Sequence, residues 1–130
     1  MLAVLVDLPG TTMPIANEQI RNRELLADMY ADDYFPDFLV DKIKVILLDL
    51  CEQIEREQPR DDELLLKLTH AATERINGLA EAFEENESEL ETGAREAMGA
   101  EFAFIVRAYG FEHVDIEDVI APRDWCAAGG

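Results

Sequence analysis

The sequence predicts an all-α fold, a compact five-helix bundle with three long antiparallel helices. Apolar residues recur at three- and four-residue spacing along most of the chain, which is the period of a helix face. Proline, glycine and short polar side chains stand where these segments begin and end, as they do at helix termini. The connections between the segments are short, and short connections favour antiparallel neighbours in a bundle.

The length of 130 residues suits one domain with its own core, and a hydrophobic content of 48% is typical of a globular protein. We therefore predict a single helical domain over residues 13–125. The opening MLAVLVDLPGTT is apolar but contains an aspartate and breaks at a Pro-Gly pair. It is expected to be a flexible extension over residues 1–12, and residues 126–130 are expected to form a flexible tail.

The first predicted helix spans residues 18–31, with Asn17 as its cap. Its apolar side consists of Leu25, Leu26, Met29 and Tyr30. The second helix begins at Pro36, because proline fits the first turn of a helix, and runs to about Gln58, before Pro59. Its apolar face consists of Leu39, Ile43, Ile46, Leu47, Leu50 and Ile54.

The third predicted helix spans residues 62–85 and is capped by Asp61. Its apolar stripe consists of Leu64, Leu65, Leu68, Ala72, Ile76, Leu79 and Phe83. The fourth runs from a capping box at Ser88 to Gly110, with Ala94, Met98, Phe102, Ile105 and Tyr109 on its buried line. The fifth is short, begins after Asp115, packs through Val119 and Ile120, and ends at Pro122.

The net charge of the chain limits the classes of function that it can have. The chain has 11 basic and 29 acidic residues, a formal net charge of −18. A field of that sign repels nucleic acids and anionic membrane surfaces and favours basic protein partners. No run is long and apolar enough to span a bilayer, and the distant Cys51 and Cys126 form neither a disulfide framework nor a zinc ligand set. These features predict a soluble, reduced, cytoplasmic protein that needs no cofactor.

His70 and Glu74 stand one helical turn apart and are the candidate metal or proton-transfer pair. On a helical wheel centred near Leu79, His70 faces solvent, away from the neighbouring helices that could supply further ligands. The glutamate of the di-iron ExxH pattern is absent, because Lys67 stands at its position. The favoured interpretation is an exposed His70–Glu74 pair on a solvated face, with a metal site as the alternative.

Arg75 falls inside the predicted apolar stripe of the third helix, between Leu64 and Leu79. A buried guanidinium needs an acidic partner, since an unpaired buried charge is very costly. Folding the third and fourth helices against each other brings Glu101 within reach. The sequence therefore predicts a buried structural ion pair between Arg75 and Glu101.

Two other stretches form a candidate partner surface. YADDYFPDF places aromatic residues among aspartates, and the stretch near residue 85 is the densest run of glutamates. Aromatic side chains anchor protein interfaces, whereas charge runs are usually solvated faces. The blander interpretation is that the aromatics seal a helix–helix corner. The residues of this candidate surface are Tyr34, Phe35, Asp37, Glu84, Glu85 and Glu87.

Three segments, YFPDFLVDKIK (34–44), LTHAATE (68–74) and APRDW (121–125), resemble a small bacterial family known only as a domain of unknown function. The resemblance covers about residues 13–125. It implies an acidic, all-helical domain and supplies no activity, substrate or catalytic residue. No catalytic motif appears elsewhere in the chain. We therefore predict a non-enzymatic protein-binding module, with a small enzyme or metal-binding bundle using His70, Glu74 and nearby acids as the alternative.

Overall fold

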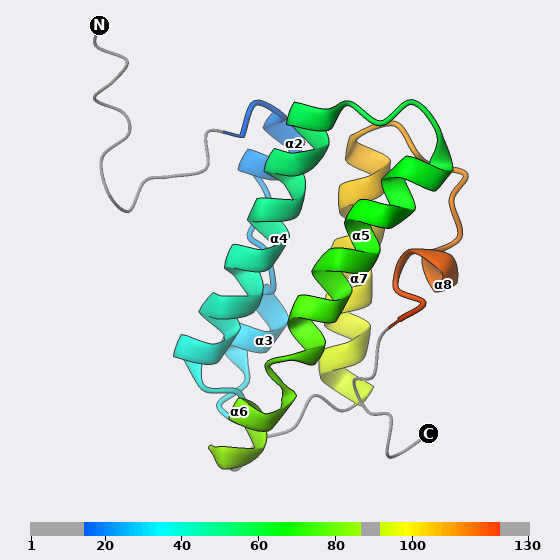
Figure 1. Ribbon diagram of the computed structural model, residues 1–130. Helices are drawn as coiled ribbons and strands as arrows, with labels where there is room; N and C mark the ends of the chain where they lie inside the picture. The colour runs from blue at the N-terminus through cyan, green and yellow to red at the C-terminus, as the bar shows by residue number, and fades with distance from the viewer. Residues whose placement is uncertain (1–14, 87–91, 123–130) are drawn as a thin grey trace, which may run out of the picture.

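The computed structural model describes residues 15–86 and 92–122, and these residues form an all-α bundle without a strand, as predicted. Three long helices form its body and run antiparallel in turn, α4 upward, α5 downward and α7 upward in Figure 1. The extension predicted over 1–12 and the tail over 126–130 lie outside the described residues. The helices are α2 (Glu18–Arg21), α3 (Ala27–Ala31), α4 (Asp37–Glu57), α5 (Asp62–Asn77), α6 (Ala80–Glu85), α7 (Thr92–Ala108) and α8 (Ile116–Val119).

Helix α4 confirms the clearest sequence pattern. All six residues of its predicted apolar face are buried, and the helix packs against α5. Pro36 stands at its N-cap, and Asp37 places an acid in the first turn, where the helix dipole favours negative charge. The helix ends at Glu57, and its C-cap Gln58 has a left-handed φ of 48°, just before Pro59. On α7, four residues of the predicted line are likewise fully buried: Ala94, Met98, Phe102 and Ile105.

The helix predicted over residues 18–31 is broken into α2 and α3, so this prediction was wrong in its continuity. Leu26 has a φ of 61°, a left-handed conformation that costs energy for a residue with a Cβ. The break lets neighbouring Leu25 and Leu26 both enter the core, at 2% and 1% exposure. A continuous helix would turn adjacent residues about 100° apart.

The helix predicted over residues 62–85 is also two helices, α5 and α6, which meet at Gly78 and Leu79. The break changes the helical phase, so Leu79 and Phe83 cannot be used to orient α5. The buried face of α5 is turned by about 60° from the predicted stripe, because Thr69 and Thr73 are buried while Leu64 is exposed.

Two threonines can be buried on α5 because their hydroxyls bond within the helix. Thr69 Oγ1 donates to the carbonyl of Leu66 at 3.2 Å, and Thr73 Oγ1 donates to that of Thr69 at 2.9 Å. These bonds remove most of the cost of burying a polar group. Treating polar residues as exposed therefore placed the core face of α5 wrongly.

The short helix α8 lies beside α5 and α7 (Figure 1) and is capped by the Asp115 carboxylate, which accepts the Glu117 N–H at 2.9 Å. Val119 and Ile120 are buried, as predicted. Asn77 Nδ2 of α5 donates to the carbonyl of Pro122 at 3.0 Å and holds the end of this segment. Among the helices of the described segments, none has the length and apolarity that a membrane span requires.

Candidate functional site

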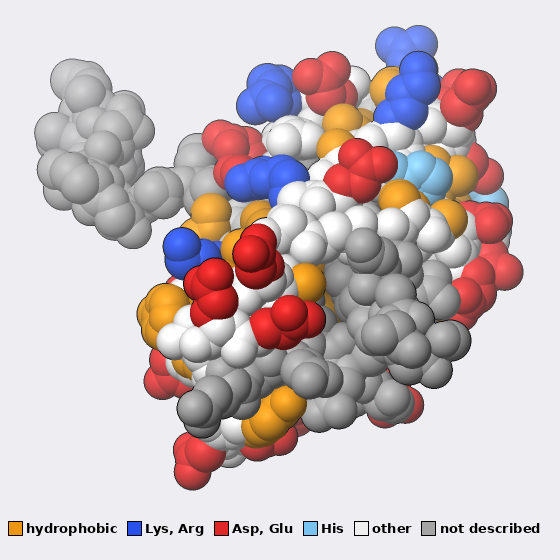
Figure 2. Space-filling view, turned by 60° about the horizontal axis from the view of Figure 1, so that its bottom comes forward, with side chains coloured by type: hydrophobic (Ala, Val, Ile, Leu, Met, Phe, Trp, Pro, Cys, Tyr) orange, Lys and Arg blue, Asp and Glu red, His pale blue; other side chains and the backbone are white. Residues whose placement is uncertain are grey.

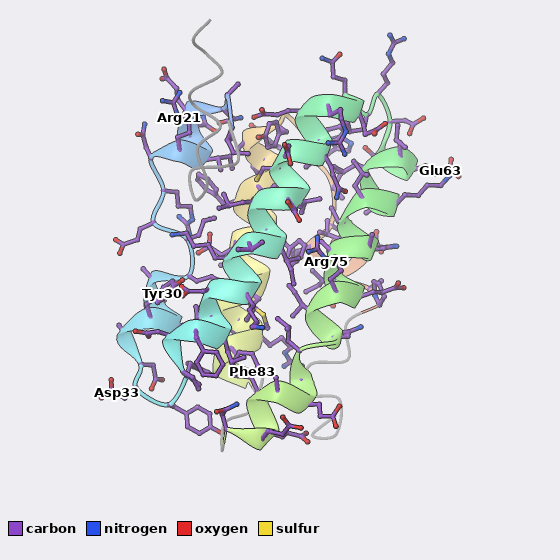
Figure 3. The ribbon with its side chains drawn as sticks, turned by 60° about the vertical axis from the view of Figure 1, so that its left-hand side comes forward. Arg21, Tyr30, Asp33, Glu63, Arg75 and Phe83 are labelled. Atoms are coloured by element: carbon purple, nitrogen blue, oxygen red, sulfur yellow. The ribbon has the colours of Figure 1, made fainter. Side chains whose placement is uncertain are left out.

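The lower end of the bundle in Figure 1 joins two segments that are distant in sequence, the α3–α4 turn and helix α6. Phe35 of the turn meets Phe83 of α6 edge to face, with ring centroids 6.5 Å apart. Both rings are buried, at 6% and 0% exposure. Figure 3 shows Phe83 reaching from α6 toward the base of α4. This aromatic contact fixes the position of α6 beside the turn.

The turn itself is organised by Asp32. Its carboxylate accepts the Tyr34 N–H at 2.9 Å, and its carbonyl accepts the Phe35 N–H at 3.1 Å. Tyr34 and Phe35 therefore point in different directions although they are adjacent. Their rings meet edge to face, with centroids 5.1 Å apart. Phe35 enters the core, whereas Tyr34 is 41% exposed and Phe38, in the first turn of α4, is 52% exposed.

Six exposed acidic side chains belong to the same two segments as these rings. The turn and the start of α4 contribute three exposed aspartates, and α6 contributes three exposed glutamates: Asp32, Asp33, Asp37, Glu81, Glu84 and Glu85. Residues 27–38 and 79–86 contain no lysine or arginine. In Figure 2, acidic side chains predominate on this face, with hydrophobic side chains between them. We call Tyr34, Phe38 and these six acids the acidic aromatic end.

The acidic aromatic end contains most of the partner surface predicted from sequence, and it joins the two stretches that the sequence showed separately. Phe35 is the exception, because it seals the corner rather than facing solvent, as the blander interpretation proposed for the aromatics. Glu87 lies outside the described residues. Exposed rings among carboxylates can bind cationic side chains through both stacking and charge.

The predicted Arg75–Glu101 ion pair is wrong. Arg75 Nη1 lies 2.9 Å from Asp49 Oδ2 of α4, and both side chains are partly exposed, at 47% and 28% (Figure 3). Arg75 points toward α4 because the buried face of α5 is rotated from the predicted stripe. Its pair with Asp49 is of the exposed kind that contributes little to stability.

Glu101 is buried, as predicted, but its partner is Arg23, from the segment between α2 and α3. Its carboxylate accepts Arg23 Nε at 2.6 Å and Nη2 at 3.3 Å, and the Leu26 N–H at 2.9 Å. The Arg23 guanidinium also lies over the Phe104 ring, 4.5 Å from its centroid. Glu101 therefore caps α3 from another helix, since Leu26 has no side-chain capping bond of its own.

A second carboxylate, Glu55 of α4, holds the start of the described chain. It accepts the N–H groups of Ala16 and Asn17 at 3.0 Å each, and the Tyr109 hydroxyl at 2.6 Å. Partial burial alone would raise the pKa of Glu55, but these hydrogen bonds outweigh it and leave the pKa below its usual value. Burial and the bond to Glu55 raise the pKa of Tyr109 well above its usual range.

Cys51 lies one turn before Glu55 and is fully buried and free. Burial raises the pKa of its thiol to about 12, so the thiol stays protonated at neutral pH. It acts as a small core residue. Cys126 lies outside the described residues.

His70 does not form the predicted exposed pair with Glu74. Its Nε2 lies 2.7 Å from the carbonyl oxygen of Asp118 and donates to it, because a carbonyl only accepts. His70 is half-buried and joins α5 to α8. The other histidine, His113, lies 2.8 Å from Asp62 at the start of α5.

Metal ligation finds no support at these residues. Over residues 15–86 and 92–122, no three His, Cys, Asp or Glu side chains are grouped so that they could hold a metal ion. Glu74 is exposed on α5, while His70 is directed at α8. The described residues therefore give no support to the metal-binding alternative.

These features define a class: a strongly acidic helical bundle that presents exposed aromatics at one end. The model of a family of unknown function (DUF5713) matches residues 19–125, and the chain belongs to this family. No curated protein and no solved structure matches the chain. The match agrees with the predicted resemblance in that the family is one of unknown function, and its start lies six residues later than expected.

Proposed function

We propose that this protein is a non-enzymatic binding module that acts in the cytoplasm and holds a basic protein at its acidic aromatic end. The observation that carries the proposal is the pairing of exposed Tyr34 and Phe38 with six exposed acids. These residues come from two distant segments that the buried Phe35–Phe83 contact holds together. A surface built this way is already organised before a partner arrives, which lowers the entropy cost of binding.

Charge and ring geometry have separate roles in this proposal. The net charge of −18 attracts a basic protein over long distances and speeds its encounter. At contact, lysine and arginine side chains of the partner pair with carboxylates, and apolar or guanidinium groups pack on Tyr34 and Phe38. The acids give rate and selectivity, and the rings give most of the affinity.

The test is affinity capture with two variants of equal charge. In the end variant, Asp33→Asn, Glu84→Gln and Glu85→Gln neutralise three of the six acids of the acidic aromatic end. In the control variant, Glu63→Gln, Glu96→Gln and Glu112→Gln neutralise three exposed acids elsewhere. A protein recovered by wild type and control, but not by the end variant, is then purified and titrated directly.

We expect the purified partner to be basic and to bind about tenfold or more weakly to the end variant and to Phe38→Ala, since central aromatics dominate binding energy. Raising salt from about 50 to 500 mM should weaken binding strongly, because it shortens the screening length to a few ångströms. Equal recovery by the end and control variants, or binding that does not respond to salt, would contradict the proposal.

A further inference from the structure

A hollow with the opposite charge lies near the upper end of the bundle, between α2, the segment that follows it and α4. Its volume is about 630 Å³, and its lining consists of Ile15, Ile20, Arg21, Arg23, Leu25, Lys44 and Leu48. Three of these seven residues are cationic and none is acidic. We call it the basic hollow. A concentration of cations is unexpected in a chain with only 11 basic residues against 29 acidic ones.

The neighbouring hollows differ in charge. A hollow of about 530 Å³ on the other side of Arg23 includes Glu24, Asp28 and Glu101 in its lining. Another, of about 560 Å³ beside Tyr109, includes Glu55. The basic hollow is therefore set apart by its chemistry and not by its size.

The three cations are held in different ways. Arg23 is positioned by its bonds to Glu101 and by the Phe104 ring. Lys44 Nζ lies 6.0 Å from the centre of the Tyr30 ring, while the Tyr30 hydroxyl bonds to Asp41. Arg21 is exposed in the last turn of α2, at the upper end of the bundle (Figure 3). The charge of Arg23 is balanced by Glu101, so Arg21 and Lys44 are the cations of the lining that suit the binding of an anion.

The rest of the lining is apolar. Ile15, Ile20 and Leu25 are buried beneath the hollow, and Leu48 is half-buried on α4. An aliphatic chain in the hollow would remove its own apolar surface and the exposed part of Leu48 from water, whereas a strongly hydrated inorganic ion would not. The volume is in the range of small-molecule sites, about 300–1,000 Å³.

The net charge of the protein selects among organic anions. Repulsion by the surrounding acids grows with the charge of the ligand, so it penalises di- and polyphosphates more than a single carboxylate. We propose that the basic hollow binds an aliphatic monocarboxylate, with its carboxylate against Arg21 and Lys44 and its chain on the apolar floor. This proposal is independent of the basic partner, which would bind at the other end of the bundle.

The test is calorimetric titration of the full chain with octanoate, with two matched comparison ligands. Octan-1-ol has the same chain without the charge, and acetate has the charge without the chain. We expect octanoate to bind more than about tenfold more tightly than either, because it uses both halves of the hollow. Shifts of the Ile20, Leu25 and Leu48 methyl signals in NMR spectra report whether it binds at this place.

Two lysines of α4 provide a control within one helix. Lys44 lines the hollow, while Lys42 is exposed and does not. Lys44→Gln should weaken octanoate binding about tenfold through loss of a charged hydrogen bond, and Arg21→Gln should do the same. Lys42→Gln, with the same change in net charge, should leave it nearly unchanged. Absence of octanoate binding, equal effects of both lysine changes, or methyl shifts elsewhere would overturn the proposal.

Discussion

Two groups of acids on this molecule illustrate opposite uses of the same charge. Glu55 and Glu101 accept backbone N–H groups of the N-terminal segment, at Ala16, Asn17 and Leu26. The six acids of the acidic aromatic end are exposed around Tyr34 and Phe38. The first group holds α2 and α3 onto α4 and α7, and the second presents charge to solvent.

The difference shows that composition does not reveal which acids stabilise the fold. A carboxylate contributes to stability where it replaces lost water with hydrogen bonds from the protein, as Glu101 does. An exposed carboxylate keeps its water and contributes mainly repulsion in a chain of this charge. Three predictions test the division, in decreasing order of expected effect.

The largest effect is expected at Glu101. Glu101→Leu should lower the free energy of unfolding by about 2–4 kcal/mol, because the Leu26 N–H loses its acceptor and Arg23 loses its carboxylate. Urea denaturation measures the loss. Arg75→Ala is the control, and it should cost only about 0.5 kcal/mol, since its pair with Asp49 is partly exposed. Similar small losses from both changes would show that Glu101 does not stabilise α3.

Glu55 should give an intermediate effect with a characteristic pH dependence. Glu55→Gln should cost about 1–2 kcal/mol at neutral pH, through weaker bonds to Ala16, Asn17 and Tyr109. Because folding lowers the pKa of Glu55, its contribution is complete above the ordinary value of 4.5 and is lost as the pH falls through the lower folded-state pKa.

The stability difference between wild type and Glu55→Gln should therefore be constant above pH 5 and shrink below pH 4.5. Urea denaturation over this range measures it. The exposed Glu63→Gln serves as the control and should show little difference at any pH. A gap between wild type and Glu55→Gln that widened in acid would contradict the assignment.

The smallest effect is expected at the acidic aromatic end. Neutralising Asp33, Glu84 and Glu85 together, as in the binding test, should change the free energy of unfolding by less than about 0.5 kcal/mol. The direction should be toward higher stability, since the change removes repulsion. Thermal and urea unfolding measure it. A loss above about 1 kcal/mol would mean that these acids hold the fold, and the binding test would then need single substitutions.

Sequence reasoning placed correctly those helices whose own residue pattern defines their ends or their buried face. On α4, six apolar residues at helical spacing lie between Pro36 and Pro59, and both ends and the buried face follow from them. The buried line of α7 was found in the same way. The partner surface was recognised as two stretches, but only the contact of Phe35 with Phe83 brings them together.

The sequence missed the features that depend on distant partners. The partner of Glu101 was misassigned because residues 18–31 looked like one helix, and a left-handed Leu26 has no local signature. His70 was placed in solvent because the segment that receives its hydrogen bond, at Asp118, is 48 residues away. No sequence pattern identified the cations of the basic hollow, Arg21, Arg23 and Lys44, since nothing in their spacing indicates that they line one hollow.

By itself, the sequence determined the helical class, the extent of α4, the buried line of α7 from Ala94 to Ile105, and the excess of negative charge. These depend on local periodicity and on composition, which are independent of the rest of the fold. Only the tertiary structure decided where α2 and α3 part, which way α5 faces, and which carboxylates are bonded. Those choices minimise the free energy of the whole molecule, in which a strained Leu26 is tolerated because its burial and its bond to Glu101 offset the strain.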